Sequence, residues 1–153
     1  MQKLEQERDI HTDFYIKEGN VFVSITRLHD YAHDICVEAE IDMKRLIVTG
    51  AKFTFDRYPE KKCELVKDME KRLIGMSVGN GAGEEIMKRF AGRDGCENVM
   101  SLLFLGVSGI VFIDYINRMK EGVITPADFM KDISAIRNNA CIAFNPAAHY
   151  EEE

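Results

Sequence analysis

The sequence predicts a single α+β domain, in which an antiparallel sheet of about four strands packs against helices on one of its faces. Three observations lead to this prediction. The chain has 153 residues, the length of one domain. Its first half alternates apolar and polar residues with a period of two, and its second half places apolar residues at helical spacing. Strands followed by helices are typical of α+β folds. We therefore expect one domain over residues 1–153, with residues 1–7 and 146–153 as flexible ends.

Four strands are expected before residue 56. The clearest covers Asp34–Ile41, because its apolar side chains alternate strictly with polar ones, as on a sheet that is buried on one side. Gly19 and Asn20 suit a tight connection between the first two strands. The four expected segments are Asp13–Lys17, Val21–Thr26, Asp34–Ile41 and Leu46–Phe55.

The period changes to that of helices after Phe55. Tyr58-Pro59 opens a segment with apolar residues at helical spacing, and Gly75 is placed to end it. The other expected elements are a short helix Glu84–Ala91, a long core helix Cys96–Lys120, a last helix from Thr125 to about Asn139 and an extended piece at Cys141–Phe144. The apolar residues of the first segment are Leu65, Val66, Met69 and Leu73.

Composition excludes several classes of protein. Twenty basic and 26 acidic residues give a formal net charge of −6, which argues against a nucleic-acid binder. The N-terminus lacks the apolar core of a signal peptide, and the apolar run Val99–Ile113 is short for a membrane span. We expect a soluble cytoplasmic protein with no membrane association. Its four cysteines, without a CxxC pair, are then expected to be reduced.

Signatures of nucleotide binding and hydrolysis are missing. The glycine-rich loop Gly79–Gly83 has no following GK[ST], and Glu84-Glu85 would repel a phosphate, so no nucleotide cofactor is expected. No GxSxG or HExxH motif is present. The sequence therefore leans towards a non-enzymatic role.

Two cysteines are candidates for metal or sulfur chemistry. Cys63 and Cys96 each lie near the start of an expected helix, where backbone N–H groups and the helix dipole favour a thiolate. Thiolates bind metal ions and carry sulfur. The alternative is that each is a small, buried hydrophobic side chain.

The segment His29–Asp34 contains two histidines and two aspartates. His33 and Asp34, joined to Cys63 and Cys96, would complete a four-coordinate site for zinc or iron. The alternative is a polar connection in which Asp30 and Asp34 accept hydrogen bonds from turn amides.

Several short motifs follow one another along the chain: His33-Asp34-Ile35, Arg57-Tyr58-Pro59 with Cys63, Leu73-Ile74-Gly75 and Gly95-Cys96 with Val99. In this order they resemble an uncharacterised bacterial family, the domain of unknown function DUF2889. The resemblance covers about residues 8–145 and implies no activity. In that family the long helix usually begins Gly-Cys-Thr-His-Leu, whereas Asn98 stands here in place of the histidine.

A more distant resemblance is to iron–sulfur scaffold proteins of the IscU/NifU type, in element order and cysteine placement. It matches Asp34, Cys63 and Cys96 to scaffold ligands, while Ala32 stands where the first scaffold cysteine would be, beside His33. This resemblance implies an IscU/NifU-like arrangement of the sheet and helices.

Three functions follow as hypotheses. The first is a small protein that binds zinc or an iron–sulfur cluster through Cys63, Cys96, Asp34 and His33, in a scaffold or sulfur-delivery role. The second is a non-catalytic interaction or accessory subunit whose cysteines are structural. The third is a thiol-dependent enzyme. The expected partner is another protein, with a homo-oligomer as a further alternative.

Overall fold

The computed structural model describes residues 5–79, 81–107 and 109–136, together with residues 142, 145 and 147. The chain divides into two compact units, residues 1–113 and 114–153. Each unit is described by itself, and a single domain over residues 1–153 stays a prediction. The extended piece predicted at Cys141–Phe144 lies outside the described residues except for Ile142, as do most of the predicted flexible ends.

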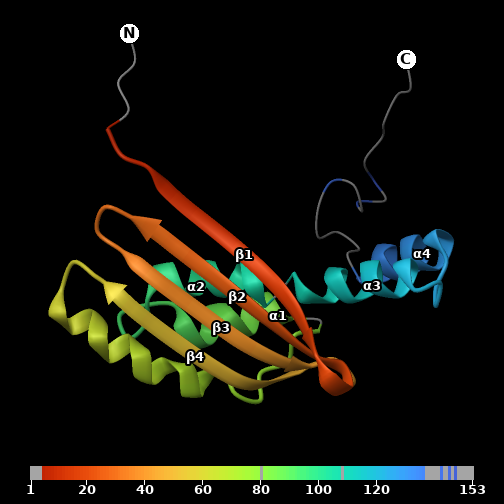
Figure 1. The fold of residues 1–153 in the computed structure, drawn as a ribbon, viewed down its shortest axis with the longest axis horizontal. Helices are drawn as coiled ribbons and strands as arrows, with labels where there is room; N and C mark the ends of the chain where they lie inside the picture. The colour runs from red at the N-terminus through yellow and green to blue at the C-terminus, as the bar shows by residue number, and fades with distance from the viewer. Residues whose placement is uncertain are drawn as a thin grey trace, which may run out of the picture. The chain divides into compact units, whose positions relative to one another are not determined.

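The first unit contains a four-stranded antiparallel sheet in the order β1-β2-β3-β4 (Figure 1). Each strand pairs with the next one along the chain, so β1 and β4 form the two margins. Gly19 and Asn20 both have positive φ in the β1–β2 connection, as their residue types predict. The strands are β1 (Arg8–Lys17), β2 (Val21–Asp30), β3 (Asp34–Asp42) and β4 (Ile47–Arg57).

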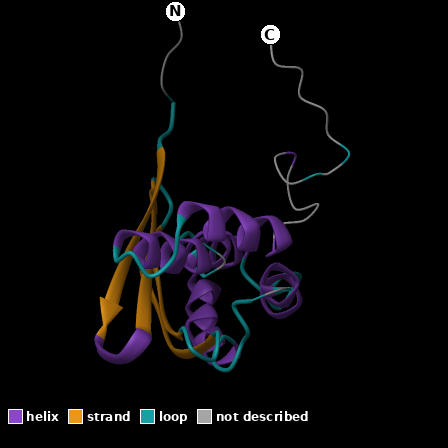
Figure 2. Ribbon diagram, turned by 90° about the vertical axis from the view of Figure 1, so that its right-hand side faces the viewer, coloured by secondary structure: helices purple, strands orange, loops and turns teal. Residues whose placement is uncertain are grey.

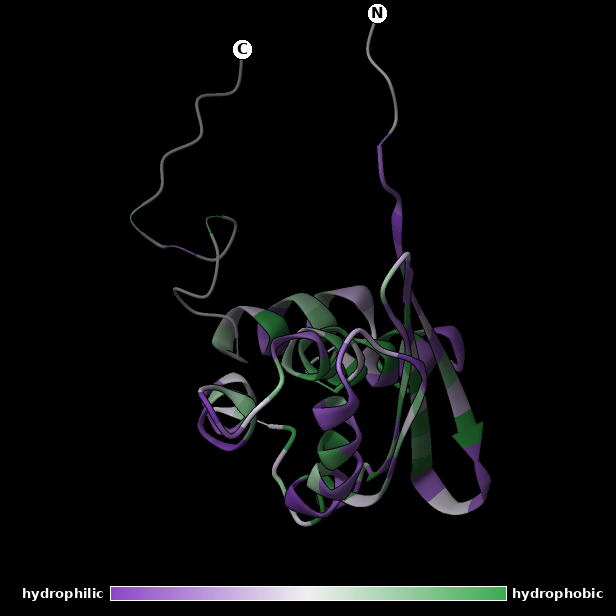
Figure 3. Cartoon of the chain, turned by 90° about the vertical axis from the view of Figure 1, so that its left-hand side faces the viewer, coloured by the Kyte–Doolittle hydropathy of each residue, from purple (hydrophilic) through white to green (hydrophobic). Residues whose placement is uncertain are grey.

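The helices of this unit cover one face of the sheet, which confirms the α+β prediction (Figure 2). Helix α2 (Glu97–Gly106) contacts β1, β2 and β3, α1 (Ala82–Phe90) packs on α2, and the 3₁₀ helix η2 (Lys61–Arg72) packs on β4. Hydrophobic residues concentrate where the helices meet the sheet (Figure 3). Alternation on β3 buries Ile35, while the next residue, Cys36, faces the other side.

The segment after Pro59 forms a 3₁₀ helix, which corrects the predicted α-helical spacing. Residues i and i+3 eclipse each other in a 3₁₀ helix, so Val66 and Met69 share one face. Met69 is buried and Val66 half-buried, whereas Leu65 turns outward and is 71% exposed. Gly75, with φ +76°, follows the helix where the sequence predicts its end.

The predicted long helix Cys96–Lys120 is two helices, α2 and α3 (Ile110–Lys120), and Cys96 is the N-cap residue of α2. At the end of α2, a Cβ on Gly106 would lie 2.5 Å from Thr26 Oγ1 of β2. By length and composition alone, Glu97–Lys120 could cross a membrane. Its first half supplies core side chains of the first unit, which requires the same apolar composition.

The second unit contains the end of α3 and helix α4 (Pro126–Ile136). Thr125 caps α4 as the sequence predicts: Asp128 N–H donates to Thr125 Oγ1 at 3.1 Å, and Thr125 N–H donates to the Asp128 carboxylate at 2.9 Å. The rings of Tyr115 and Phe129 pack edge to face, 5.8 Å apart, and join the two helices.

Candidate functional site

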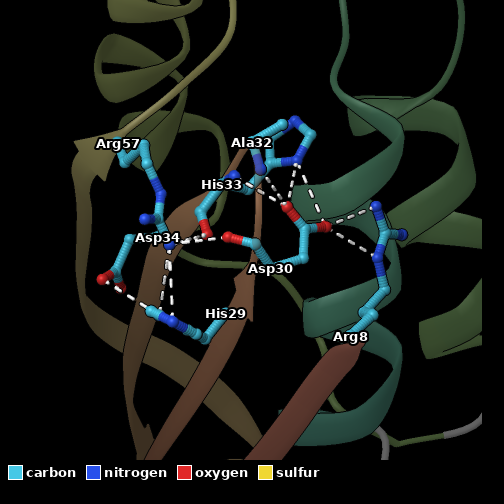
Figure 4. Close-up of polar contacts among 7 residues, drawn as sticks. All are labelled: Arg8, His29, Asp30, Ala32, His33, Asp34 and Arg57. Atoms are coloured by element: carbon cyan, nitrogen blue, oxygen red, sulfur yellow. Dashed lines mark hydrogen bonds and ion pairs between the residues drawn. The ribbon is translucent and has the colours of Figure 1, made fainter. Parts of the chain in front are cut away.

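The connection between β2 and β3 is organised by the carboxylate of Asp30 (Figure 4). Its Oδ1 accepts hydrogen bonds from the backbone N–H groups of Ala32, at 2.8 Å, and His33, at 2.7 Å. The Asp30 N–H donates to the His33 carbonyl at 2.9 Å. Asp30 therefore satisfies the turn amides, which confirms the part of that interpretation that concerns Asp30; Asp34 contacts His29 instead.

Two cationic or polar side chains hold the same carboxylate from outside the turn. Arg8 of β1 donates through Nε at 2.8 Å and through Nη2 at 2.7 Å, both to Asp30 Oδ2. His33 Nδ1 lies 3.0 Å from Oδ1. Burial opposes the charge of Asp30, but the hydrogen bonds from His33, Ala32 and Arg8 outweigh it and lower the pKa to about 2. Asp30 is thus an anion that ties β1 to the turn.

A second group of polar side chains lies beside this turn. Arg57, at the end of β4, donates to the carbonyls of Asp30, at 2.6 Å, and His33, at 3.3 Å. Its guanidinium lies against the ring of His29, whose Nδ1 is 3.2 Å from Asp34 Oδ2. An open cleft of about 730 Å³ adjoins these side chains. The residues from β4 and the turn fix the geometry of this end of the sheet.

The two predicted ligands from this segment have separate partners. His33 contacts Asp30, and Asp34 contacts His29 (Figure 4). Asp34 sits on the first position of β3 and pairs across the sheet with His29 and Arg57. The structure therefore engages His33 and Asp34 in two different contacts.

Cys63 lies at the start of η2, where its backbone N–H donates to the Glu60 carbonyl at 2.8 Å. Its side chain is half-buried near Tyr58, whose hydroxyl donates to Glu64. That hydrogen bond is the largest of the effects that raise the pKa of Tyr58. The predicted position of Cys63, early in a helix, is confirmed, with 3₁₀ in place of α geometry.

Cys96 lies at the corner between α1 and α2. Its N–H donates to the Phe90 carbonyl at 3.1 Å, its thiol makes no capping hydrogen bond, and its side chain packs, half-buried, against the core. Gly95 before it approaches α1 so closely that a Cβ would lie 2.0 Å from the Phe90 carbonyl oxygen. Packing at the corner between α1 and α2 therefore accounts for the presence of Gly95 and Cys96 at these positions.

The four predicted ligands do not form a shared cluster. Within the described part of the chain, which includes all four, no group of three or more His, Cys, Asp or Glu side chains is arranged to hold a metal ion. Metal binding through Cys63, Cys96, Asp34 and His33 stays a prediction, and the contacts above give each residue another role.

Two contributors to this site, Arg8 and Arg57, were not among the site residues expected from the sequence. Arg8 lies 22 residues from Asp30, so their contact depends on the strand register, which no local pattern encodes. Arg57 stands in the Arg-Tyr-Pro motif, and its position before Pro59 at a strand end was a signal that could have been used.

The architecture defines a small α+β domain, with a four-stranded antiparallel sheet, covered on one face and closed at one end by the Asp30 turn. Residues 8–107 match the family model for DUF2889, a protein family of unknown function, and the chain belongs to that family. No curated protein and no solved structure matches the chain. The IscU/NifU-like arrangement stays a prediction.

Proposed function

We propose that this chain is a non-catalytic interaction domain that binds a protein partner along strand β1, and that its described cysteines are structural. The observation that supports the proposal most directly is the exposure of β1. Among the described strands, this ten-residue segment pairs with β2 alone. Its apolar side chains Ile10, Tyr15 and Ile16 are 39%, 51% and 58% exposed.

An edge strand of this length offers a row of backbone donors and acceptors to another chain. Proteins usually guard such edges with charged side chains. In β1, three charged residues are instead engaged within the chain: Arg8 with Asp30, Asp13 with Arg27, and Lys17 with Glu40. These three ion pairs run to residues of β2 and β3, and the apolar side chains Ile10, Tyr15 and Ile16 stay accessible.

The cysteines fit this function as packing residues. Cys96 packs against the core at a helix corner. Cys36 is half-buried on β3, and burial raises the pKa of its thiol, which disfavours the thiolate that a metal or a nucleophilic reaction needs. Binding of zinc or an iron–sulfur cluster is the competing proposal, and a thiol-dependent enzyme is the third.

The test compares three immobilised proteins in a capture experiment: the wild type, Ile16→Lys and Leu65→Lys. Ile16 and Leu65 are both exposed apolar residues, but Leu65 lies on η2, so it serves as the matched control. We expect a partner that the wild type and Leu65→Lys retain and Ile16→Lys loses, with unchanged circular dichroism in all three. A partner that Ile16→Lys still retains would contradict binding along β1.

A further inference from the structure

We propose that the partner of β1 is a second copy of this chain, joined by antiparallel pairing of β1 with its equivalent. This inference rests on the proposed function and names its partner. The result is a continuous sheet with four strands from each copy. A symmetric dimer of this kind uses one surface twice, so the sequence of β1 has to be complementary to itself.

The symmetry restricts the register. A two-fold axis perpendicular to the sheet keeps each face on its own side, so residues that oppose each other across the axis must share a face. Since side chains alternate along a strand, only residues separated by an even number can oppose each other. The axis therefore lies midway between one residue of β1 and the same residue of the second copy. Each register is named below by the residue at its axis.

An axis through Asp13 gives the best complementarity. Ile10 then opposes Ile16 of the second copy, and this apolar pair forms twice, on the face that the helices cover only in part. On the other face, Asp9 opposes Lys17. The Lys17 ammonium has three donors, so it can bind this aspartate in addition to Glu40. His11 and Tyr15 oppose each other between these pairs.

Neighbouring registers are less favourable. An axis through His11 places Ile10 opposite Thr12, and an axis through Phe14 places Ile16 opposite Thr12, so in neither register do Ile10 and Ile16 oppose each other. An axis through Thr12 sets the exposed Ile16 against Arg8, which is held by Asp30. In the favoured register the two Asp13 side chains oppose each other. Each is paired within its own chain with the Arg27 guanidinium at 3.0 Å and hydrogen-bonded to His11 at 2.8 Å.

The first measurement is the molar mass of the purified full chain by sedimentation over a range of micromolar concentrations. We expect a dimer for the wild type and for Leu65→Lys. Ile16→Lys places a lysine opposite Ile10 in both of the Ile10–Ile16 pairs. The dissociation constant of the dimer should therefore rise by roughly tenfold or more. Circular dichroism of the variants checks that the fold is retained.

The second measurement tests the register by disulfide cross-linking. A disulfide requires Cα atoms within about 4.4–6.8 Å, and across a two-fold axis only the residue on the axis meets a copy of itself at that distance. Under mild oxidation, Asp13→Cys should form a covalent dimer well above the background of the wild-type cysteines, and Thr12→Cys should not. Cross-linking of Thr12→Cys in preference to Asp13→Cys would overturn the register.

The outcomes separate this inference from the proposed function. If the wild type stays monomeric, the proposal that a second copy binds β1 is overturned. This holds whether another protein or another segment of the chain covers β1. In that case the capture experiment still decides whether β1 binds a different protein. A dimer that Ile16→Lys leaves unchanged overturns the inference as well, because its interface then lies elsewhere.

Discussion

Asp30 shows how one side chain can set the geometry of a strand end. Its carboxylate accepts hydrogen bonds from two turn amides, a histidine and an arginine, and it is 3% exposed. A buried carboxylate is costly unless its charge is compensated, and here Arg8 supplies the compensating charge. The same contact holds the beginning of β1, the strand to which we assign partner binding.

The lowered pKa of Asp30 predicts a specific pH dependence of stability. The pKa in the folded state is about 2 and the ordinary value is 3.8, so the unfolded chain binds the proton more tightly. The stabilisation is therefore complete above the ordinary value and is lost as the pH falls through about 2. We expect Asp30→Asn to melt well below the wild type at pH 7, and this difference to shrink as the pH approaches 2.

Thermal melts followed by circular dichroism between pH 2 and pH 7 test this prediction, with Asp42→Asn as the control. Asp42 accepts backbone hydrogen bonds from Lys44, at 2.9 Å, and Arg45, at 3.1 Å, in the β3–β4 turn, so it has a similar local role. Among the described residues, no arginine side chain forms an ion pair with it. An asparagine oxygen can still accept these bonds. A difference between Asp30→Asn and the wild type that is the same at all pH values would contradict a role for the charge.

At the scale of elements, the corner between α1 and α2 depends on the lack of a side chain at Gly95. A Cβ there would lie 2.0 Å from the oxygen and 2.6 Å from the carbon of the Phe90 carbonyl, and both atoms belong to the backbone. Gly95→Ala should therefore destabilise the fold by about 2 kcal/mol or more, because a helix end has to move. Urea denaturation of the variant measures this cost.

Gly79→Ala is the control for that substitution. A Cβ at Gly79 would meet Ser77 Oγ at 3.6 Å and Leu46 Cδ1 at 3.8 Å, which are ordinary van der Waals contacts. We expect its unfolding free energy to stay within about 0.5 kcal/mol of the wild type. If Gly95→Ala and Gly79→Ala change the unfolding free energy equally, the corner between α1 and α2 tolerates a side chain at Gly95, which would contradict this prediction.

The elements that could be predicted from the sequence are those set by local patterns. The alternation in Asp34–Ile41 predicts β3, and the Thr125 and Asp128 pair predicts the start of α4. The division of the expected helix Cys96–Lys120 into α2 and α3 is not signalled by its continuous apolar composition. The close approach of Gly106 to Thr26, 80 positions earlier in the chain, likewise follows from packing rather than from a local pattern. The 3₁₀ geometry of η2 could not be predicted either, because the four apolar residues of this segment have a spacing that also fits an α-helix.

The candidate site shows the same division. The residue types of His29–Asp34 predict a turn closed by aspartate, and Asp30 forms it. The expected ligands, including Cys63 and Cys96, belong to separate elements, and the relative placement of these elements follows from packing, which no local pattern encodes. His33 and Asp34, although adjacent, have different partners.

For the molecule as a whole, the core of the first unit packs the sheet against its helices through apolar contacts, and we expect its stability to be independent of metal. A structural zinc site would contribute about 10–16 kcal/mol to folding, so chelation would unfold such a protein. Dialysis against a chelator should leave the melting temperature of the full chain unchanged. Elemental analysis before and after dialysis should give no stoichiometric zinc or iron, in the wild type as in Cys63→Ser. A melting temperature that falls on chelation, with about one metal per chain lost in Cys63→Ser, would instead support the metal-binding proposal.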